Sequence, residues 1–229
     1  MPDNCAVGGP FPPVNLGSFS GAGSAVKSAN GDVTVDKVDS GLVLDLTSQH
    51  GSITIAHKID QNSKATLTAC GAVNIGEKID QHSRATILAH GDVSIGQKID
   101  QWSRDIIITS TKGGIDIGEK VDQHSQARLT AATTVHIGQK IDQHSEVTIV
   151  AQGDITIDEG IDQHAVADIT SVNGNIIIGQ AVDGEAVATL RAPKGHITIK
   201  QKVAGGATVN WSAITFTCPD QSGGTVNPI

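Results

Sequence analysis

Hydrophobic and polar positions recur along this chain with a period of about 20 residues. Two successive units read V-N-I-G-E-K-I-D-Q-H-S-R-A-T-I-L-A-H-G-D from Val73 and V-S-I-G-Q-K-I-D-Q-W-S-R-D-I-I-I from Val93. Aligned units begin at Val33, Ile53, Val73, Val93, Ile115, Val135, Ile155, Ile176 and Ile197. A fixed period of this length is the signature of a repeat architecture, and nine units fill residues 31–213.

Each unit contains three short apolar stretches: V-x-I, the isoleucine of K-I-D, and A-x-I-x-A. Apolar residues alternate with polar ones inside a stretch, which predicts strands, and no segment has the 3.6-residue period of a helix. The leucine-rich pattern and the G-G-x-G-x-D calcium repeat are both absent. We therefore predict an all-β, right-handed parallel β-helix (β-solenoid) of about nine coils, 20–22 residues each. At ~4.8 Å per coil, nine coils make a rod of roughly 43 Å.

The predicted core is the set of apolar residues on the inner side of each stretch, since a single coil cannot bury its own apolar face. In one unit these residues are Val73, Ile75, Ile79, Ala85, Ile87 and Ala89. Stacking places their equivalents above and below them in every other coil.

Two segments, Gly31-Asp32-Val33-Thr34-Val35 and Gly91-Asp92-Val93-Ser94-Ile95, carry a family resemblance. The unit resembles the coils of bacterial parallel β-helix repeat proteins, namely filamentous-haemagglutinin-type adhesins and adhesin-like proteins of the G-D-V-x-V type. That resemblance implies a surface or structural role without catalysis.

The two ends differ in composition from the repeats. Six of the seven prolines lie outside the repeats, and proline cannot donate a hydrogen bond to a strand ladder. We therefore divide the chain into a Pro/Gly-rich N-terminal tail or cap (1–30), the solenoid (31–213) and a C-terminal cap or tail (214–229).

Aromatic and cysteine residues near the ends are the candidates for self-association. The aromatic rings either cover the first and last coils or contact a neighbouring molecule. The two terminal cysteines lie beyond opposite ends of the predicted rod, so they could join successive subunits. These candidate residues are Phe11, Phe19, Trp211, Phe216, Cys5 and Cys218. The expected partner is a second copy of the chain, bound end to end or through the tails.

Three polar positions of the repeat form columns when the coils stack. The aspartate column is Asp60, Asp80, Asp100, Asp122, Asp142, Asp162 and Asp183. The lysine column, two residues earlier on the same face, is Lys58, Lys78, Lys98, Lys120 and Lys140. The glutamine column is Gln61, Gln81, Gln101, Gln123, Gln143 and Gln163. We interpret the first two as a charge-balanced solvated wall, and the third as a turn-lining ladder of amides.

The column after the glutamines is rich in imidazoles: Asn62, His82, Trp102, His124, His144, His164 and Glu185. We expect the rings to stack on one another and on Trp102, with stability or assembly responding to pH. No metal site is predicted, because a linear ladder does not converge on one ion. The candidates for a metal, if one bound, would be the three consecutive histidines His124, His144 and His164.

Composition narrows the function classes. The net charge of −8 disfavours nucleic acid, which requires a basic surface. No run of 18 apolar residues and no Sec-type signal is present, so we expect no membrane span and a protein that is cytoplasmic or exported by a leaderless route. With three cysteines, at least one thiol is free or bonded between chains.

These observations favour a non-enzymatic structural β-solenoid: a self-assembling filament subunit, a scaffold or an adhesin-like surface protein. One alternative is a polysaccharide-active β-helix enzyme of the lyase or hydrolase type. Such an enzyme needs loop insertions and an irregular acidic cleft, whereas the only insertion is two residues near Ser110-Thr111-Lys112. Another is a bactofilin-like cytoskeletal polymer. No catalytic residue or cofactor is predicted, and no residue pattern favours a carbohydrate ligand.

Overall fold

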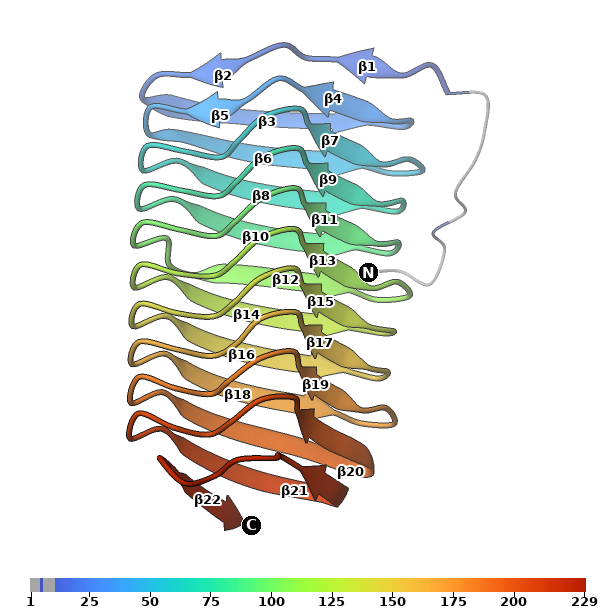
Figure 1. Cartoon of the computed structure of the whole chain (residues 1–229). Coiled ribbons are helices and arrows are strands. Elements are labelled where there is room, and N and C mark those ends of the chain that lie inside the picture. The colour runs from blue at the N-terminus through green and yellow to red at the C-terminus, as the bar shows by residue number, and fades with distance from the viewer. Residues whose placement is uncertain (1–4, 6–10) are drawn as a thin grey trace.

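The regular structure of this chain is a parallel β-solenoid of about 11 turns (Figure 1). The computed structural model describes residue 5 and residues 11–229, and every strand pair in that part of the chain is parallel. In Figure 1 the chain runs leftward along the near side, returns rightward along the far side and descends with each turn, which is a right-handed path. The predicted fold class is confirmed.

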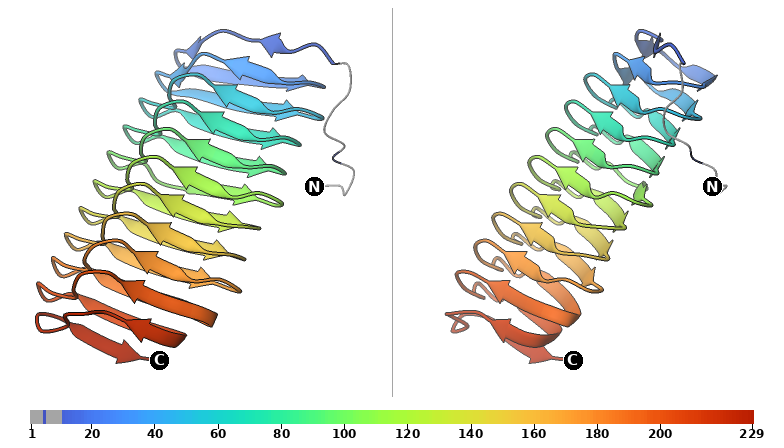
Figure 2. Two further views of the ribbon diagram at one scale, coloured as in Figure 1. Left: turned by 45° about the vertical axis from the view of Figure 1, so that its right-hand side comes forward. Right: turned by 90° about the vertical axis from the view of Figure 1, so that its right-hand side faces the viewer.

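The coils stack into three faces, two of them built from strands and the third largely from single bridging residues (Figure 2). The long strands are β3 (Gly23–Ala29), β6 (Leu42–Ser48), β8 (Lys64–Ala69), β10 (Arg84–Ala89), β12 (Ile106–Ser110), β14 (Gln126–Ala131), β16 (Glu146–Ala151), β18 (Val166–Ser171), β20 (Val187–Ile199), β21 (Thr208–Thr217) and β22 (Thr225–Pro228). The short strands are β1 (Val14–Asn15), β4 (Val33–Val35), β7 (Ile53–Ile55), β9 (Val73–Ile75), β11 (Val93–Ile95), β13 (Ile115–Ile117), β15 (Val135–Ile137), β17 (Ile155–Ile157) and β19 (Ile176–Ile178). The third face is the pair β2 (Phe19–Ser20) and β5 (Val38–Asp39), continued by single bridges that start with Val38 to Ile59 and Ile59 to Ile79.

The core is a set of aliphatic columns along the rod. Strand β9 pairs with β11 so that Val73 aligns with Val93 and Ile75 with Ile95, and Ile79 bridges to Ile99. All six core residues predicted for this unit are buried, at 1% exposure or less. Each stack removes apolar surface from water at roughly 25 cal/mol per Å², which makes these columns the main stabilising contribution.

Variation in coil length comes from defined turns. Three residues separate a long strand ending in alanine from the next short strand, as between Ala89 and Val93. Four residues follow when the strand ends in serine, as between Ser110 and Ile115. The Ser110 hydroxyl accepts a hydrogen bond from the Gly113 amide (3.0 Å) and donates one to the carbonyl of Gly91 in the preceding coil (2.8 Å). The serine hydroxyl therefore provides a hydrogen-bond partner for backbone N–H and C=O groups at the longer turn.

The two-residue insertion predicted near Ser110-Thr111-Lys112 is in fact divided between two places. One residue lengthens the turn after Ser110. The other lies before β12, where Asp105 adopts a left-handed backbone with φ of 54°. The strand register shows the residue before β12 directly. Thr86 of β10 aligns with Ile107 of β12, one residue more than the usual repeat of 20, whereas Gln126 of β14 aligns with Glu146 of β16 at the usual repeat.

The solenoid extends further toward both termini than the nine predicted coils. Strand β1 pairs with β4 and β3 with β6, so a coil precedes the first repeat, and β22 pairs with β21 after the last one. The N-terminal coil escaped sequence detection because the inward positions of its long strand, β3, are not large and apolar. Ala25 and Lys27 align with the core residues Leu44 and Leu46 of the next coil.

No helix in the described part of the chain is long and apolar enough to cross a membrane.

Candidate functional site

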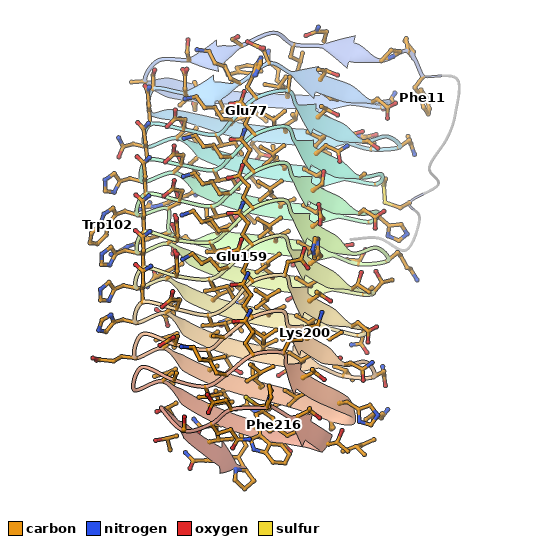
Figure 3. All side chains as sticks on the ribbon, viewed as in Figure 1. Phe11, Glu77, Trp102, Glu159, Lys200 and Phe216 are labelled. Carbon is orange, nitrogen blue, oxygen red and sulfur yellow. A yellow bond between two sulfur atoms is a disulfide. The ribbon has the colours of Figure 1, made fainter. Side chains whose placement is uncertain are left out.

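One edge of the solenoid carries an unusual row of side chains, which we name the Gln–His corner. It joins the third face to the long strands, and its rings project in a line at the left of Figure 3, near the labelled Trp102. The corner consists of six residue pairs: Gln61–Asn62, Gln81–His82, Gln101–Trp102, Gln123–His124, Gln143–His144 and Gln163–His164.

Both residues of every corner pair have a left-handed backbone, with φ between 50° and 63°. Non-glycine residues lose roughly 1–2 kcal/mol each in this conformation, and glycine is the usual occupant. Coils nearer the ends do use glycine at these positions, as Gly184 or as the pair Gly205–Gly206. The central coils therefore keep side chains at the corner despite a conformational cost.

A buried carboxylate supports the corner from inside. In four of the six corner coils the aspartate before the glutamine accepts a hydrogen bond from its amide, as where the Gln81 N–H donates to Asp80 Oδ1 at 2.6 Å; the other three amides are those of Gln61, Gln101 and Gln163. The other carboxylate oxygen forms an ion pair with the lysine two residues earlier, as in Lys140–Asp142 at 2.8 Å. Five aspartates in successive coils are fully buried: Asp60, Asp80, Asp100, Asp122 and Asp142.

This burial corrects the solvated wall expected from the sequence. The lysines share a face with the aspartates as predicted, but their stems lie over the carboxylates, and the lysine side chains themselves are only 21–30% exposed in these five coils. Lysine can cover apolar or buried surface with its methylene chain while its amine stays near water. Each Lys–Asp pair is therefore a buried bracket, which we call the Lys–Asp bracket.

Where the bracket lacks its lysine, the aspartate is more open. Gly160 replaces the lysine in one coil, and the Asp162 side chain there is 33% exposed. Its nearest cation is Lys140 of the preceding coil, 3.8 Å away. Asp162 is thus exposed where its lysine is missing, which indicates that the other aspartates are buried because each has its own lysine.

The aspartates of two neighbouring brackets have pKa values shifted in opposite directions. Burial, reinforced by a hydrogen bond to Asp100, raises the pKa of Asp122 to about 6 although Lys120 opposes the change. Burial acts on Asp100 as well, but the hydrogen bond from Asp122 and the Lys98 cation outweigh it and lower the pKa of Asp100. Two carboxyl groups this close do not both ionise readily, so Asp122 is the first of the two to be protonated as the pH falls.

The rings at the second corner position stack along the rod, as predicted. Centroid separations are 4.1 Å for Trp102–His124, 4.8 Å for His124–His144 and 4.7 Å for His144–His164, with interplanar angles of 4–13°. We call His124, His144 and His164 the histidine run. These spacings match the distance between parallel strands, so the backbone sets the stack.

The arrangement of the rings is poorly suited to a metal ion. Zn–N bonds are about 2.0–2.1 Å long, so two ligating nitrogens cannot be more than roughly 4.2 Å apart. Parallel rings 4.7–4.8 Å apart do not converge to that geometry. Across the described residues, no group of three or more His, Cys, Asp or Glu side chains is placed to hold a metal ion.

Two further histidines lie between carboxylates on the short-strand side, a feature that the sequence analysis missed. His136 contacts Asp116 at 2.6 Å and Asp158 at 3.0 Å. Burial lowers its pKa, but the two carboxylates outweigh burial and raise it. His57 lies between Asp36 (3.3 Å) and Glu77 (2.8 Å). The signal was a histidine with one acidic residue at the same repeat position in an adjacent coil, Asp116 for His136 and Glu77 for His57; the second carboxylate comes from a different position.

The six residues predicted for self-association are divided between the ends. Phe11 stacks on His50 at 5.2 Å and Phe19 packs on the first coils. Trp211 and Phe216 stack on each other at 4.9 Å and cover the last coils.

Cys5 forms a disulfide with Cys70 inside the chain, whereas Cys218 is a free, partly buried thiol. The expected bond between Cys5 of one subunit and Cys218 of the next is corrected accordingly. Because Cys5 is bonded to Cys70, it lies beside the rod and not beyond its end. Residues 1–4 and 6–10 of the predicted N-terminal tail lie outside the described residues.

Comparison with known proteins finds no match: no family model, no curated protein and no solved structure resembles the chain closely enough to be assigned to it. The fold fits the β-helix repeat class and no particular family within it.

Proposed function

We propose that this protein is a non-enzymatic structural rod, a scaffold of fixed length that presents side chains at regular intervals. The observation that carries this proposal is the repetition of one supporting device, the Lys–Asp bracket, in five successive coils. Catalysis requires one distinctive arrangement of groups, whereas repeated brackets offer the same arrangement in every coil. A rod needs this uniformity, because each coil must stack on the next.

The ends favour a rod over a filament. Lys27 occupies a core column at the N-terminal end, where a further coil would bury its amine. An inward-pointing charge of this kind protects an open strand edge. At the other end Pro228 lies in the last strand, β22, and has no N–H to donate to another strand. End-to-end growth by strand pairing is therefore opposed at both ends.

Sedimentation and electron microscopy of the parent protein and of Lys27→Leu test this proposal. We expect the parent to be a monomeric rod of roughly 50 Å, from about 11 coils at ~4.8 Å. Lys27→Leu should associate more strongly, because it continues an apolar column. Lys64→Leu, which removes an exposed lysine from the side of the rod, is the matched control.

Filaments of the parent would instead support the self-assembling subunit expected from the sequence. Release of new reducing ends from an incubated polysaccharide would support the enzyme alternative. Either result would overturn the proposal of a fixed-length scaffold.

A further inference from the structure

The lysine column of the solenoid is interrupted in two successive coils. Lys140 is followed at this position by Gly160 and Ala181, and the lysine returns as Lys202. Single bridges between the neighbouring residues keep these coils in register. The gap therefore results from missing side chains, since the backbone of each coil is in its usual place.

A hollow of about 250 Å³ lies at this gap. Its lining includes both flanking lysines and three carboxyl side chains, those of Glu159, Asp162 and Asp183. Glu159 is labelled in Figure 3. Sites for drug-sized ligands have volumes of roughly 300–1,000 Å³, so a hollow of this size suits a small molecule or one side chain.

Asp162 is the carboxylate at the gap that has no close cation. Asp183 forms an ion pair at 3.2 Å with Lys202, whose own coil has no aspartate at the bracket position. Lys140 lies 2.8 Å from its own Asp142 and 3.8 Å from Asp162. In the described part of the chain no other cation lies within 4 Å of Asp162. The gap is thus short of one ammonium group, next to a carboxylate that is 33% exposed and open to a ligand.

We propose that this hollow binds a primary alkylammonium group, the chemistry of a lysine side chain, with Asp162 as its carboxylate partner. Five other coils of the same chain show this arrangement, because the equivalent aspartate of each Lys–Asp bracket holds a lysine ammonium. In those coils the alkyl stem lies over the carboxylate, and at the gap the space for that stem is open. An external alkylammonium group restores the arrangement of the complete brackets.

The chain does not fill the hollow from Gly160 itself. A Cβ atom at Gly160 would lie 2.4 Å from the carbonyl oxygen of Ala181, so a lysine there would require the backbone to move. A metal ion fits less well than an ammonium group. No group of three or more His, Cys, Asp or Glu side chains among the described residues is placed to hold a metal. An ammonium group needs only a carboxylate for a charge-assisted hydrogen bond.

The probe for this site is n-butylammonium, which has the alkyl chain and ammonium group of lysine without its backbone. At low ionic strength, where exposed charges are little screened, we expect saturable binding by calorimetry with a dissociation constant in the millimolar range. Asp162→Asn should weaken this binding at least tenfold. Asp168→Asn is the matched control, because it removes a carboxylate of the same coil that pairs with Arg191 outside the hollow.

Two further arms separate a specific site from general attraction of cations. Tetramethylammonium has the same charge but no N–H group, and should not show saturable binding. Ala181→Lys places a lysine stem in the hollow from a position that already carries a Cβ, so it should abolish binding of n-butylammonium. Circular dichroism and melting check that each variant is folded.

The source of the ammonium group is distinguished by a second probe, Nα-acetyl-lysine methylamide. Tighter binding of this probe than of n-butylammonium assigns the hollow to a lysine side chain of another protein, and weaker binding assigns it to a free amine. The proposal is overturned if n-butylammonium shows no saturable binding up to about 50 mM, or if Asp162→Asn binds as the parent does. Neither result depends on whether the protein is a rod or a filament, so the hollow and the proposed function are tested separately.

Discussion

Removing the lysine from one Lys–Asp bracket should destabilise the solenoid in a pH-dependent way, and Lys120→Met is the best test. Asp122 is fully buried and its ion-pair partner Lys120 is 21% exposed. Breaking a buried ion pair by removing one partner costs about 3–5 kcal/mol. Because the Lys120 amine is partly hydrated, we expect a loss of about 2–4 kcal/mol at pH 7.5, or roughly 5–15 °C in melting temperature.

The pH dependence follows from the raised pKa of Asp122. The pKa of Asp122 is about 6 in the folded protein and about 3.8 in the unfolded chain, a gap equivalent to roughly 3 kcal/mol. For a carboxyl group whose pKa is raised on folding, stability is highest below the unfolded value and falls as pH rises through the folded value. Lys120 lowers this pKa, so its removal raises the pKa further. Most of the loss in Lys120→Met should therefore disappear at pH 4.5, where Asp122 is protonated.

Urea denaturation of the parent and variants at pH 7.5 and pH 4.5 measures these differences. Lys120→Met/Asp122→Asn removes the unpaired charge and should recover most of the stability at pH 7.5. Asp162→Asn is the matched control from the coil that already lacks its lysine, and should change stability by less than about 1 kcal/mol, since that carboxylate is one-third exposed. A loss of equal size at both pH values would refute the reasoning, because a buried charge would not then be its cause.

Three further predictions follow from the core, the corner and the disulfide. Ile79→Asp places a charge in a fully buried column and should cost several kcal/mol in urea denaturation, whereas Thr86→Asp on the exposed face should cost little. Replacing the whole histidine run by asparagine should lower the melting temperature, because it removes aromatic rings stacked 4.7–4.8 Å apart; identical melting temperatures for variant and parent would contradict this. Reducing the Cys5–Cys70 bond, which spans 65 residues, should lower stability by about 4 kcal/mol, and Cys5→Ser should remove the effect of reductant.

The coils and core could be predicted because each repeat encodes its own strands. Alternation of apolar and polar residues within a few positions fixes which side chains face inward, as for Val73 and Ile75, and stacking then repeats the result. The stack of aromatic rings at the Gln–His corner could be predicted from the same register. These features depend on residues that are close in sequence or separated by one period.

The features that were missed depend on contacts that no local pattern contains. Burial of the aspartates results from the path of the lysine stems, and the charges alone suggested exposure. The N-terminal coil is defined by its pairing with β6, although Lys27 sits where the repeat would have a leucine. The Cys5–Cys70 disulfide joins residues 65 apart, and no repeat period relates the two positions.

Toward the C-terminus, the lysine, the corner side chains and the aspartate are lost in successive coils. The order of these losses indicates that the aspartate supports the corner. The lysine is lost first, at Gly160, while Asp162 still accepts a hydrogen bond from the amide of left-handed Gln163 at 2.6 Å. In the next coil Gly184 replaces the glutamine, and Asp183 accepts from its amide at 2.7 Å. The aspartate disappears only in the following coil, where the corner is Gly205–Gly206 and neither position carries a side chain. An aspartate precedes the corner wherever the corner retains a side chain, and in most of these coils it accepts a hydrogen bond from the first corner amide, which indicates that the carboxylate stabilises the left-handed backbone. Glycine adopts that backbone unaided, and the coil that uses glycine at both positions has no aspartate.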